Sequence, residues 1–168
     1  MFEFARHLGT TRLSEAIQST LWLTPLLQAI HILMIGIVFI SVLIVVLRVQ
    51  GRIRADEPFA QTWARFAPWM KWALVVMAAT GLVLCIGEPL REAKALSFWL
   101  KMALILVGVL GLLALRRSAS RVAGNDMPGG LRFASGMLLA VWIAIIYLGR
   151  AIAYDAEVWG RLSLGHLA

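Results

Sequence analysis

Four long apolar stretches follow one another along the chain, separated by short polar segments. The first runs from Leu21 to Leu47 without a formally charged residue. A helix rises ~1.5 Å per residue, so a stretch of this length can cross the ~30 Å apolar core of a bilayer. Within residues 21–153 we predict four membrane-spanning helices, at residues 24–48, 68–87, 98–116 and 131–153. Because the links are short, the expected fold is all-α, an integral membrane four-helix bundle with antiparallel up-down topology.

The segments around the spans carry weaker signals. Residues 1–20 alternate apolar and polar side chains at helical spacing, which predicts an N-terminal amphipathic helix lying in the membrane interface. Ser97 is the expected N-cap of the third span. For residues 154–168 we predict a polar tail, in which Asp155 and Glu157 are solvated. On the fourth span, the small residues Gly136, Ala140 and Ala144 predict close helix packing.

Composition supports a membrane protein and excludes a second, soluble domain. The chain has 168 residues, of which 61% are hydrophobic, and a mean hydropathy of +0.83. Soluble domains are ~45–50% apolar. Outside the apolar stretches, no polar segment is long enough to bury a core of its own. The net charge of +7 does not indicate nucleic-acid binding, because the basic residues lie mostly between the spans without interleaved aromatic residues.

The basic residues instead indicate how the chain is oriented. Two links, between spans one and two and between spans three and four, together contain eight arginines. They are Arg48, Arg52, Arg54, Arg65, Arg116, Arg117, Arg121 and Arg132. Links rich in arginine usually face the cytoplasm, so we expect both termini to be extracytoplasmic. The inverted topology is the alternative.

The few polar residues inside the spans are predicted to lie at one depth, in the outer half of the membrane. His31 is ~10 Å below the outer end of span one, on the rise of a helix, with Gln28 one turn above it. On the same rise, four further residues of spans three and four lie ~5–9 Å deep. They are Lys101, Met102, Tyr147 and Arg150.

One interpretation of this layer is purely structural. Lys101 and Arg150 are close enough to the interface to extend toward the headgroups, and His31 can bond to Thr80 or Tyr147 across helices. The protein would then be a scaffold or a non-catalytic membrane subunit that docks a periplasmic partner, another membrane protein or a second copy of itself.

The second interpretation is a redox cofactor. A histidine that projects into a helical bundle is a common axial ligand of haem iron, and Lys101 and Arg150 have the charge to bind the two propionates. No second histidine lies inside a span, so Met102, Met34, an open coordination position or a second copy would complete the site. A b-type haem serving membrane electron transfer is the favoured hypothesis.

Two other ligands stay open. A quinone needs a hydrogen-bonding group such as His31 or Tyr147 and an apolar trough. Copper(I) would suit imidazole and thioether ligands, although the methionines do not cluster. We find no sequence motif of a soluble enzyme, which favours an electron-transfer or accessory protein over an enzyme.

Five short motifs together resemble a known family. They are WLTPLLQAIHIL at residues 22–33, TGLVL at 80–84, GEPLR at 87–91, SFWLK at 97–101 and GRAIAY at 149–154. They resemble a family of small bacterial four-span inner-membrane proteins without an assigned function. The resemblance implies a multi-pass protein of the bacterial inner membrane whose motif positions include His31, Glu88, Lys101 and Arg150. A more distant likeness is to the membrane part of copper-resistance D proteins and to b-type cytochromes.

Overall fold

The fold is dominated by four long helices. A computed structural model describes residues 2–122 and 124–164, and the four helices in it are long and apolar enough to cross a membrane. They are α3 (Leu23–Val49), α4 (Phe59–Gly87), α6 (Leu96–Ala119) and α7 (Gly129–Ala151). The length and composition of these helices make the chain a multi-pass membrane protein, as the sequence predicts.

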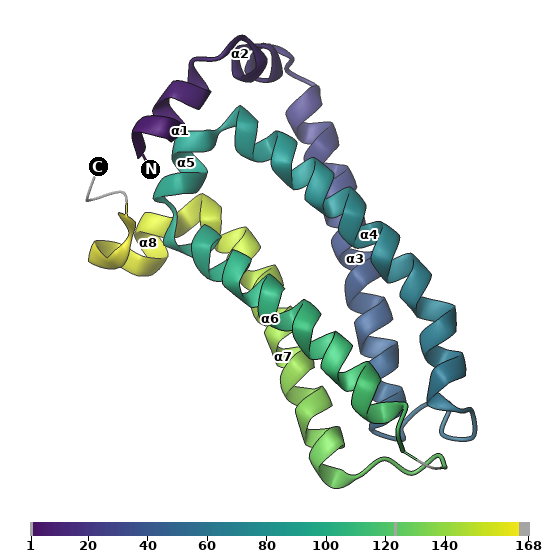
Figure 1. Ribbon diagram of the computed structural model, residues 1–168. Coiled ribbons are helices and arrows are strands. Elements are labelled where there is room, and N and C mark those ends of the chain that lie inside the picture. Colours follow the sequence, from purple (N-terminus) through teal and green to yellow (C-terminus); the bar gives the residue numbers. More distant parts are fainter. Residues whose placement is uncertain (1, 123, 165–168) are drawn as a thin grey trace.

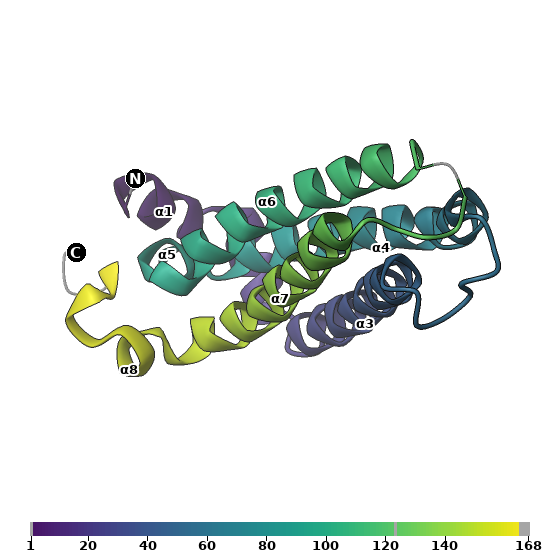
Figure 2. The same ribbon diagram turned by 90° about the horizontal axis from the view of Figure 1, so that it is seen from below.

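The long helices form two antiparallel hairpins. Helix α3 packs along α4 and helix α6 packs along α7, and the hairpins meet through α3 and α7 (Figures 1 and 2). Both hairpin turns lie at one end of the molecule, which we call the loop end. From there α3 and α7 diverge toward the opposite end (Figure 1).

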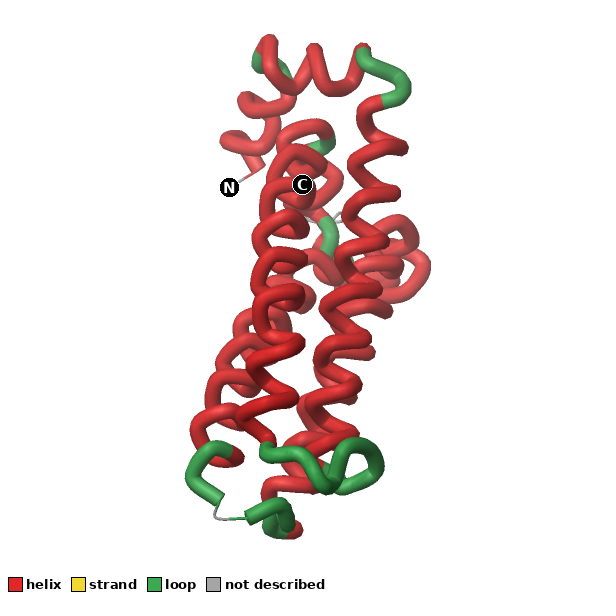
Figure 3. Tube along the Cα trace, turned by 90° about the vertical axis from the view of Figure 1, so that its right-hand side faces the viewer, coloured by secondary structure: helices red, strands yellow, loops and turns green. Residues whose placement is uncertain are grey.

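Short helices cover that opposite end, which we call the capped end (Figure 3). They include α1 (Phe2–Gly9), α2 (Arg12–Ser19), α5 (Pro89–Lys94) and α8 (Asp155–Trp159). Short 3-10 turns, η1 (Ile152–Tyr154) and η2 (Gly160–Leu162), flank α8. The described part of residues 154–168 is therefore folded rather than a simple polar tail. Residues 165–168 lie outside the described residues.

The N-terminal segment folds back over the bundle as two helices instead of one. Thr11 accepts a hydrogen bond from the backbone N–H of Ser14 and so caps the start of α2. The amide of Gln18 donates to the carbonyl of Gly87 at 2.8 Å, which satisfies an end group of α4. Whether α1 and α2 also lie in the membrane interface stays a prediction.

Helix α4 begins nine residues before the predicted start of span two. It runs from Phe59 and contains Pro68, which the sequence placed at the beginning of the span. At ~1.5 Å per residue, 29 residues extend ~43 Å, so α4 is longer than the apolar core of a bilayer. The apolar stretch marks only the part of this helix that crosses the core.

The best-packed part of the interior lies toward the loop end. Along one face of α3, four valines at helical spacing, Val38, Val42, Val45 and Val49, are each no more than 1% exposed. Between α6 and α7, the absence of a side chain at Gly108 leaves room for Trp142, whose Cε2 atom would lie 3.2 Å from a Cβ at that position. In the predicted stripe of small residues on α7, Ala140 is exposed, whereas Gly136 and Ala144 are half-buried.

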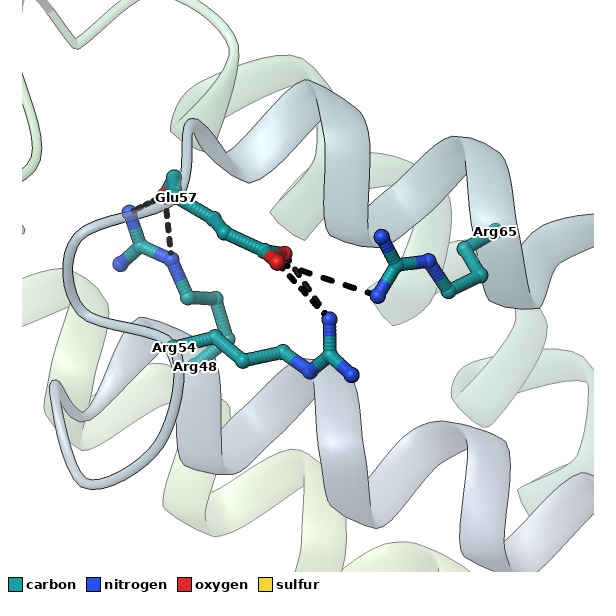
Figure 4. A network of polar contacts seen from close by, with 4 residues as sticks. All are labelled: Arg48, Arg54, Glu57 and Arg65. Atoms are coloured by element: carbon teal, nitrogen blue, oxygen red, sulfur yellow. Dashed lines mark hydrogen bonds and ion pairs between the residues drawn. The ribbon is translucent and has the colours of Figure 1, made fainter.

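A buried arginine joins the two loops at the loop end. The side chain of Arg48 is fully buried, and its Nε donates to the carbonyl of Glu57 at 2.9 Å (Figure 4). A second nitrogen donates to the same carbonyl, and Nη1 donates to the carbonyl of Asn125 at 3.4 Å. The carboxylate of Glu57 pairs in turn with Arg54 at 2.9 Å and with Arg65 at 3.8 Å. Arg48 is thus a structural link and not only a topology signal.

Candidate functional site

His31 faces the interior of the protein. It lies seven residues before Val38, on the same face of α3 as the buried valines, and it is half-buried. Its ring packs over Gly81 of α4, where a Cβ would lie 3.4 Å from Cε1 of the ring. Its Nδ1 atom is 2.8 Å from Oγ1 of Thr80 on the same helix. Interhelical bonding to Thr80 was one of the predicted arrangements.

The contact between His31 and Thr80 fits either tautomer of the ring, because the hydroxyl hydrogen can point to Nδ1 or to a backbone carbonyl. Oγ1 of Thr80 lies 2.9 Å from the carbonyl of Val76 and 3.2 Å from that of Met77. In the described residues no hydrogen bond engages Nε2 of His31. When the hydroxyl donates to one of the two carbonyls, it accepts from Nδ1–H of His31, and Nε2 carries a free lone pair. A nitrogen in this state can bind a metal or accept a hydrogen bond.

Lys101 lies at the same end of the bundle, on α6. It is half-buried, and its ammonium is close enough to His31, Cys85 and Glu92 to interact with them electrostatically. The end of the side chain lies against α7, where Nζ is 3.7 Å from the position of a Cβ on Gly149. The structure thus brings His31, Thr80 and Lys101 to one level.

The remaining residues of the predicted layer point elsewhere. Gln28 is exposed, Tyr147 is 63% exposed and Met102 is 38% exposed. Arg150 is exposed as well, and its guanidinium lies 5.7 Å from the centre of the Tyr154 ring. These four side chains lie on outward surfaces, so the interior site that geometry supports consists of His31 with its partners.

Glu88 and Glu92 frame the site from α5 and the residue before it. Glu88 forms an ion pair with Arg91, so it does not pair with Lys101 or Arg150. Burial raises the pKa of Glu92, and the charge of Glu88 acts in the same direction, while Arg91 and Lys101 oppose the shift. Glu92 is therefore easier to protonate than an exposed glutamate.

The prediction that Asp155 is solvated was wrong, because its side chain is buried. Its side chain accepts from the backbone N–H groups of Leu96 at 3.0 Å and Ser97 at 2.8 Å, so α8 caps the start of α6. Ser97 is not the N-cap; its hydroxyl accepts from the indole of Trp159. Burial would raise the pKa of Asp155, but hydrogen bonds from Leu96, Ser97 and Ser163 outweigh burial and lower it. Such a contact between distant segments leaves no local sequence signal.

Metal binding by protein side chains alone is not supported in the described part of the chain. Residues 2–122 and 124–164 contain no group of three or more His, Cys, Asp or Glu side chains that could hold a metal ion. A copper ion held through His31 would therefore lack ligands of these types. Haem iron differs, because the porphyrin supplies four nitrogens and one protein ligand can complete a five-coordinate centre.

Comparison with known proteins identifies a family. The model of a family of unknown function, DUF6644, matches residues 14–155. The chain belongs to this family. The match covers His31, Thr80 and Lys101 together with the four long helices, which confirms the predicted resemblance to a family without an assigned function. A search of curated proteins and a search of solved structures each find no match. The likeness to copper-resistance D proteins and b-type cytochromes stays a prediction.

Proposed function

We propose that this DUF6644 protein binds a redox cofactor through Nε2 of His31 and serves membrane electron transfer, with b-type haem as the cofactor. The observation that carries the proposal is the hydrogen bond between Nδ1 of His31 and Thr80. Histidines that bind metals almost always donate their other ring N–H to a neighbour, which fixes the tautomer and the ring plane. Thr80 provides this neighbour and leaves Nε2 available for the iron.

The shape of the bundle supports a cofactor at this depth. The interior face of α3 is fully buried at Val38 and Val42, but only half-buried at His31, which lies nearer the capped end. Burial along α3 therefore decreases in the direction in which α3 and α7 diverge, from the loop end toward the capped end (Figure 1). An apolar macrocycle beside His31 would bury the parts of the interior helix faces that the two hairpins leave exposed. Lys101 turns toward α7, so the proposal depends on His31 and Thr80 and not on a propionate contact from Lys101.

The proposed location follows from the arginines and the family resemblance. With the loop end in the cytoplasm, the capped end and His31 face the periplasmic side of a bacterial inner membrane. A haem in this half of the membrane could exchange electrons with a periplasmic or membrane partner. The protein would then carry electrons rather than transform a substrate itself.

Absorption spectra of the purified protein test the proposal. The protein should be expressed with a haem precursor, purified in mild detergent, and measured oxidised and after reduction with dithionite. We expect a Soret band that His31→Ala removes and that His7→Ala, on exposed α1, leaves unchanged. Thr80→Val should keep the fold and lower the affinity for added haemin by ~10–100-fold, as expected when the partner of a metal-binding histidine is lost.

Two outcomes would overturn the proposal. One is a His31→Ala protein that keeps the full Soret band, which would place any haem elsewhere. The other is a wild-type protein that is colourless and does not bind haemin. If that colourless protein co-purifies with a second chain, the structural interpretation of His31 holds and the protein is a membrane subunit.

A further inference from the structure

The loop end carries more positive charge than its own carboxylates neutralise. Its two turns with the flanking helix ends, residues 48–65 and 116–132, contain eight arginines and three acidic residues. Four of the arginines bond to backbone carbonyls or to a carboxylate: Arg48, Arg54, Arg65 and Arg132. The other four are exposed and, among residues 2–122 and 124–164, pair with no carboxylate: Arg52, Arg116, Arg117 and Arg121.

Three of these unpaired residues lie together at the end of α6, and we call them the α6 arginine cluster. Arg116 and Arg117 belong to the last turn of the helix, and Arg121 follows two residues after the helix ends. The guanidinium of Arg116 lies 5.5 Å from the centre of the Trp63 ring on α4, in a cation–π contact. Like charges on neighbouring residues repel one another, so an anion bound among them would stabilise the cluster.

The outer surface of α6 next to this cluster is apolar. Leu106, Leu110 and Leu113 are 61%, 56% and 41% exposed. Their spacing of four and three residues places them on one face of the helix, and Arg117 follows four residues after Leu113 on that face. At ~1.5 Å per residue, Arg117 lies ~6 Å beyond the last leucine along the helix axis. An exposed apolar stripe that ends in arginines matches the shape and polarity of a phospholipid.

We propose that the α6 arginine cluster binds the headgroup of an anionic phospholipid, whose acyl chains lie along the three leucines of α6. The planar guanidinium of arginine presents several N–H donors in a fork that suits phosphate oxygens. Clusters of basic residues beside a membrane-spanning helix attract anionic lipids. A free phosphate ester would contact only the arginines, so the apolar stripe beside them favours a lipid. The site includes no residue of the proposed cofactor site and does not depend on haem.

Native mass spectrometry of the full chain, held in detergent and titrated with lipid, tests the site. The two probes are phosphatidylglycerol, which is anionic, and phosphatidylethanolamine with the same acyl chains, which is zwitterionic. We expect phosphatidylglycerol to bind saturably and more tightly than phosphatidylethanolamine. The preference should weaken as the salt concentration rises, because the arginines are exposed and salt screens their charge.

Two double variants that remove the same charge from the same end of the molecule locate the site. Arg117→Gln/Arg121→Gln should lower the affinity for phosphatidylglycerol at least ~10-fold, because each basic residue at a membrane surface contributes a factor of about five. This variant keeps the contact of Arg116 with α4 and should melt at the wild-type temperature. Arg52→Gln/Arg132→Gln lies outside the cluster and should leave the affinity unchanged.

Three outcomes would overturn the proposal. One is a wild-type protein that binds the two lipids equally or shows no saturable binding. Another is an equal loss of affinity in the two double variants, which would leave the arginines as topology signals. The third is glycerophosphoglycerol, the headgroup without acyl chains, binding as tightly as the lipid, which would assign the cluster to a free phosphate ester. Should the cluster variant unfold, Arg117→Gln and Arg121→Gln separately should each weaken binding about fivefold. His31→Ala should bind phosphatidylglycerol normally, so a colourless protein does not count against this site.

Discussion

Loss of Arg48 should destabilise the protein far more than loss of any other arginine in the loops. Its guanidinium is fully buried and donates twice to the carbonyl of Glu57 and once, at 3.4 Å, to that of Asn125. A hydrogen bond from a charged group contributes about 1.5–3 kcal/mol. The two bonds to Glu57 share one oxygen and do not add fully, and the bond to Asn125 is long. We therefore expect Arg48→Gln to lower the free energy of unfolding by about 2–4 kcal/mol.

Thermal unfolding in detergent, followed by helical circular dichroism, measures this effect. For a chain of this size, 1 kcal/mol corresponds to about 2–4 °C, so the melting temperature should fall by roughly 4–16 °C. Arg48→Lys should fall between wild type and Arg48→Gln, because one ammonium can still reach the Glu57 carbonyl. Arg52→Gln is the matched control, since Arg52 is exposed four residues further along. Equal melting temperatures for Arg48→Gln and Arg52→Gln would refute the structural role and leave both residues as topology signals.

Two further substitutions test the packing at other places. Asp155→Asn should destabilise α6 by about 0.5–1.5 kcal/mol, the net contribution of one hydrogen bond, because both carboxylate oxygens accept and the amide keeps only one acceptor oxygen; exposed Glu157→Gln is the control. Because the pKa of Asp155 is lowered in the folded protein, its contribution is complete above the unfolded pKa of about 3.9 and is lost as the pH falls through the folded value. The difference between wild type and Asp155→Asn should thus be constant from pH 7 to 5 and shrink below about pH 4; a constant difference down to pH 2 would contradict the shift. Gly108→Leu should separate α6 from α7 and lower the melting temperature, whereas Gly36→Leu, where a Cβ meets nothing within 4 Å, should not; equal effects would show that the Trp142 contact is unimportant.

The four spans could be predicted because lipid imposes a simple rule on composition. A span must be apolar over the thickness of the bilayer core, and α3 accordingly begins and ends within one residue of its predicted bounds. The same rule failed at the start of α4, because a helix can continue beyond the core, where polar residues are tolerated. Hydropathy therefore locates where a helix crosses the membrane and not where its hydrogen bonds begin.

Contacts between distant segments could not be predicted from local patterns. Asp155 caps α6 from 59 residues away, and Arg48 reaches a carbonyl 77 residues away. In both cases the sequence shows only a charge near a polar segment, which usually means an exposed side chain. The bond between His31 and Thr80 was accessible to prediction, because both residues lie inside spans where an unpaired polar group is unfavourable. The outward placement of Tyr147 and Met102 was not, since depth along a helix does not determine the direction of a side chain.

The polar ties at the two ends of the molecule differ in whether they connect the two hairpins. At the loop end, Arg48 connects both loops and the valines of α3 close the interior. At the capped end, two polar ties between separate segments each remain within one hairpin: Gln18 binds the end of α4, and Asp155 binds the start of α6. Separating the hairpins at the capped end would therefore break neither tie. His31 lies on the first hairpin at this end, so the cofactor proposed there would lie between the hairpins while each hairpin keeps its own hydrogen bonds.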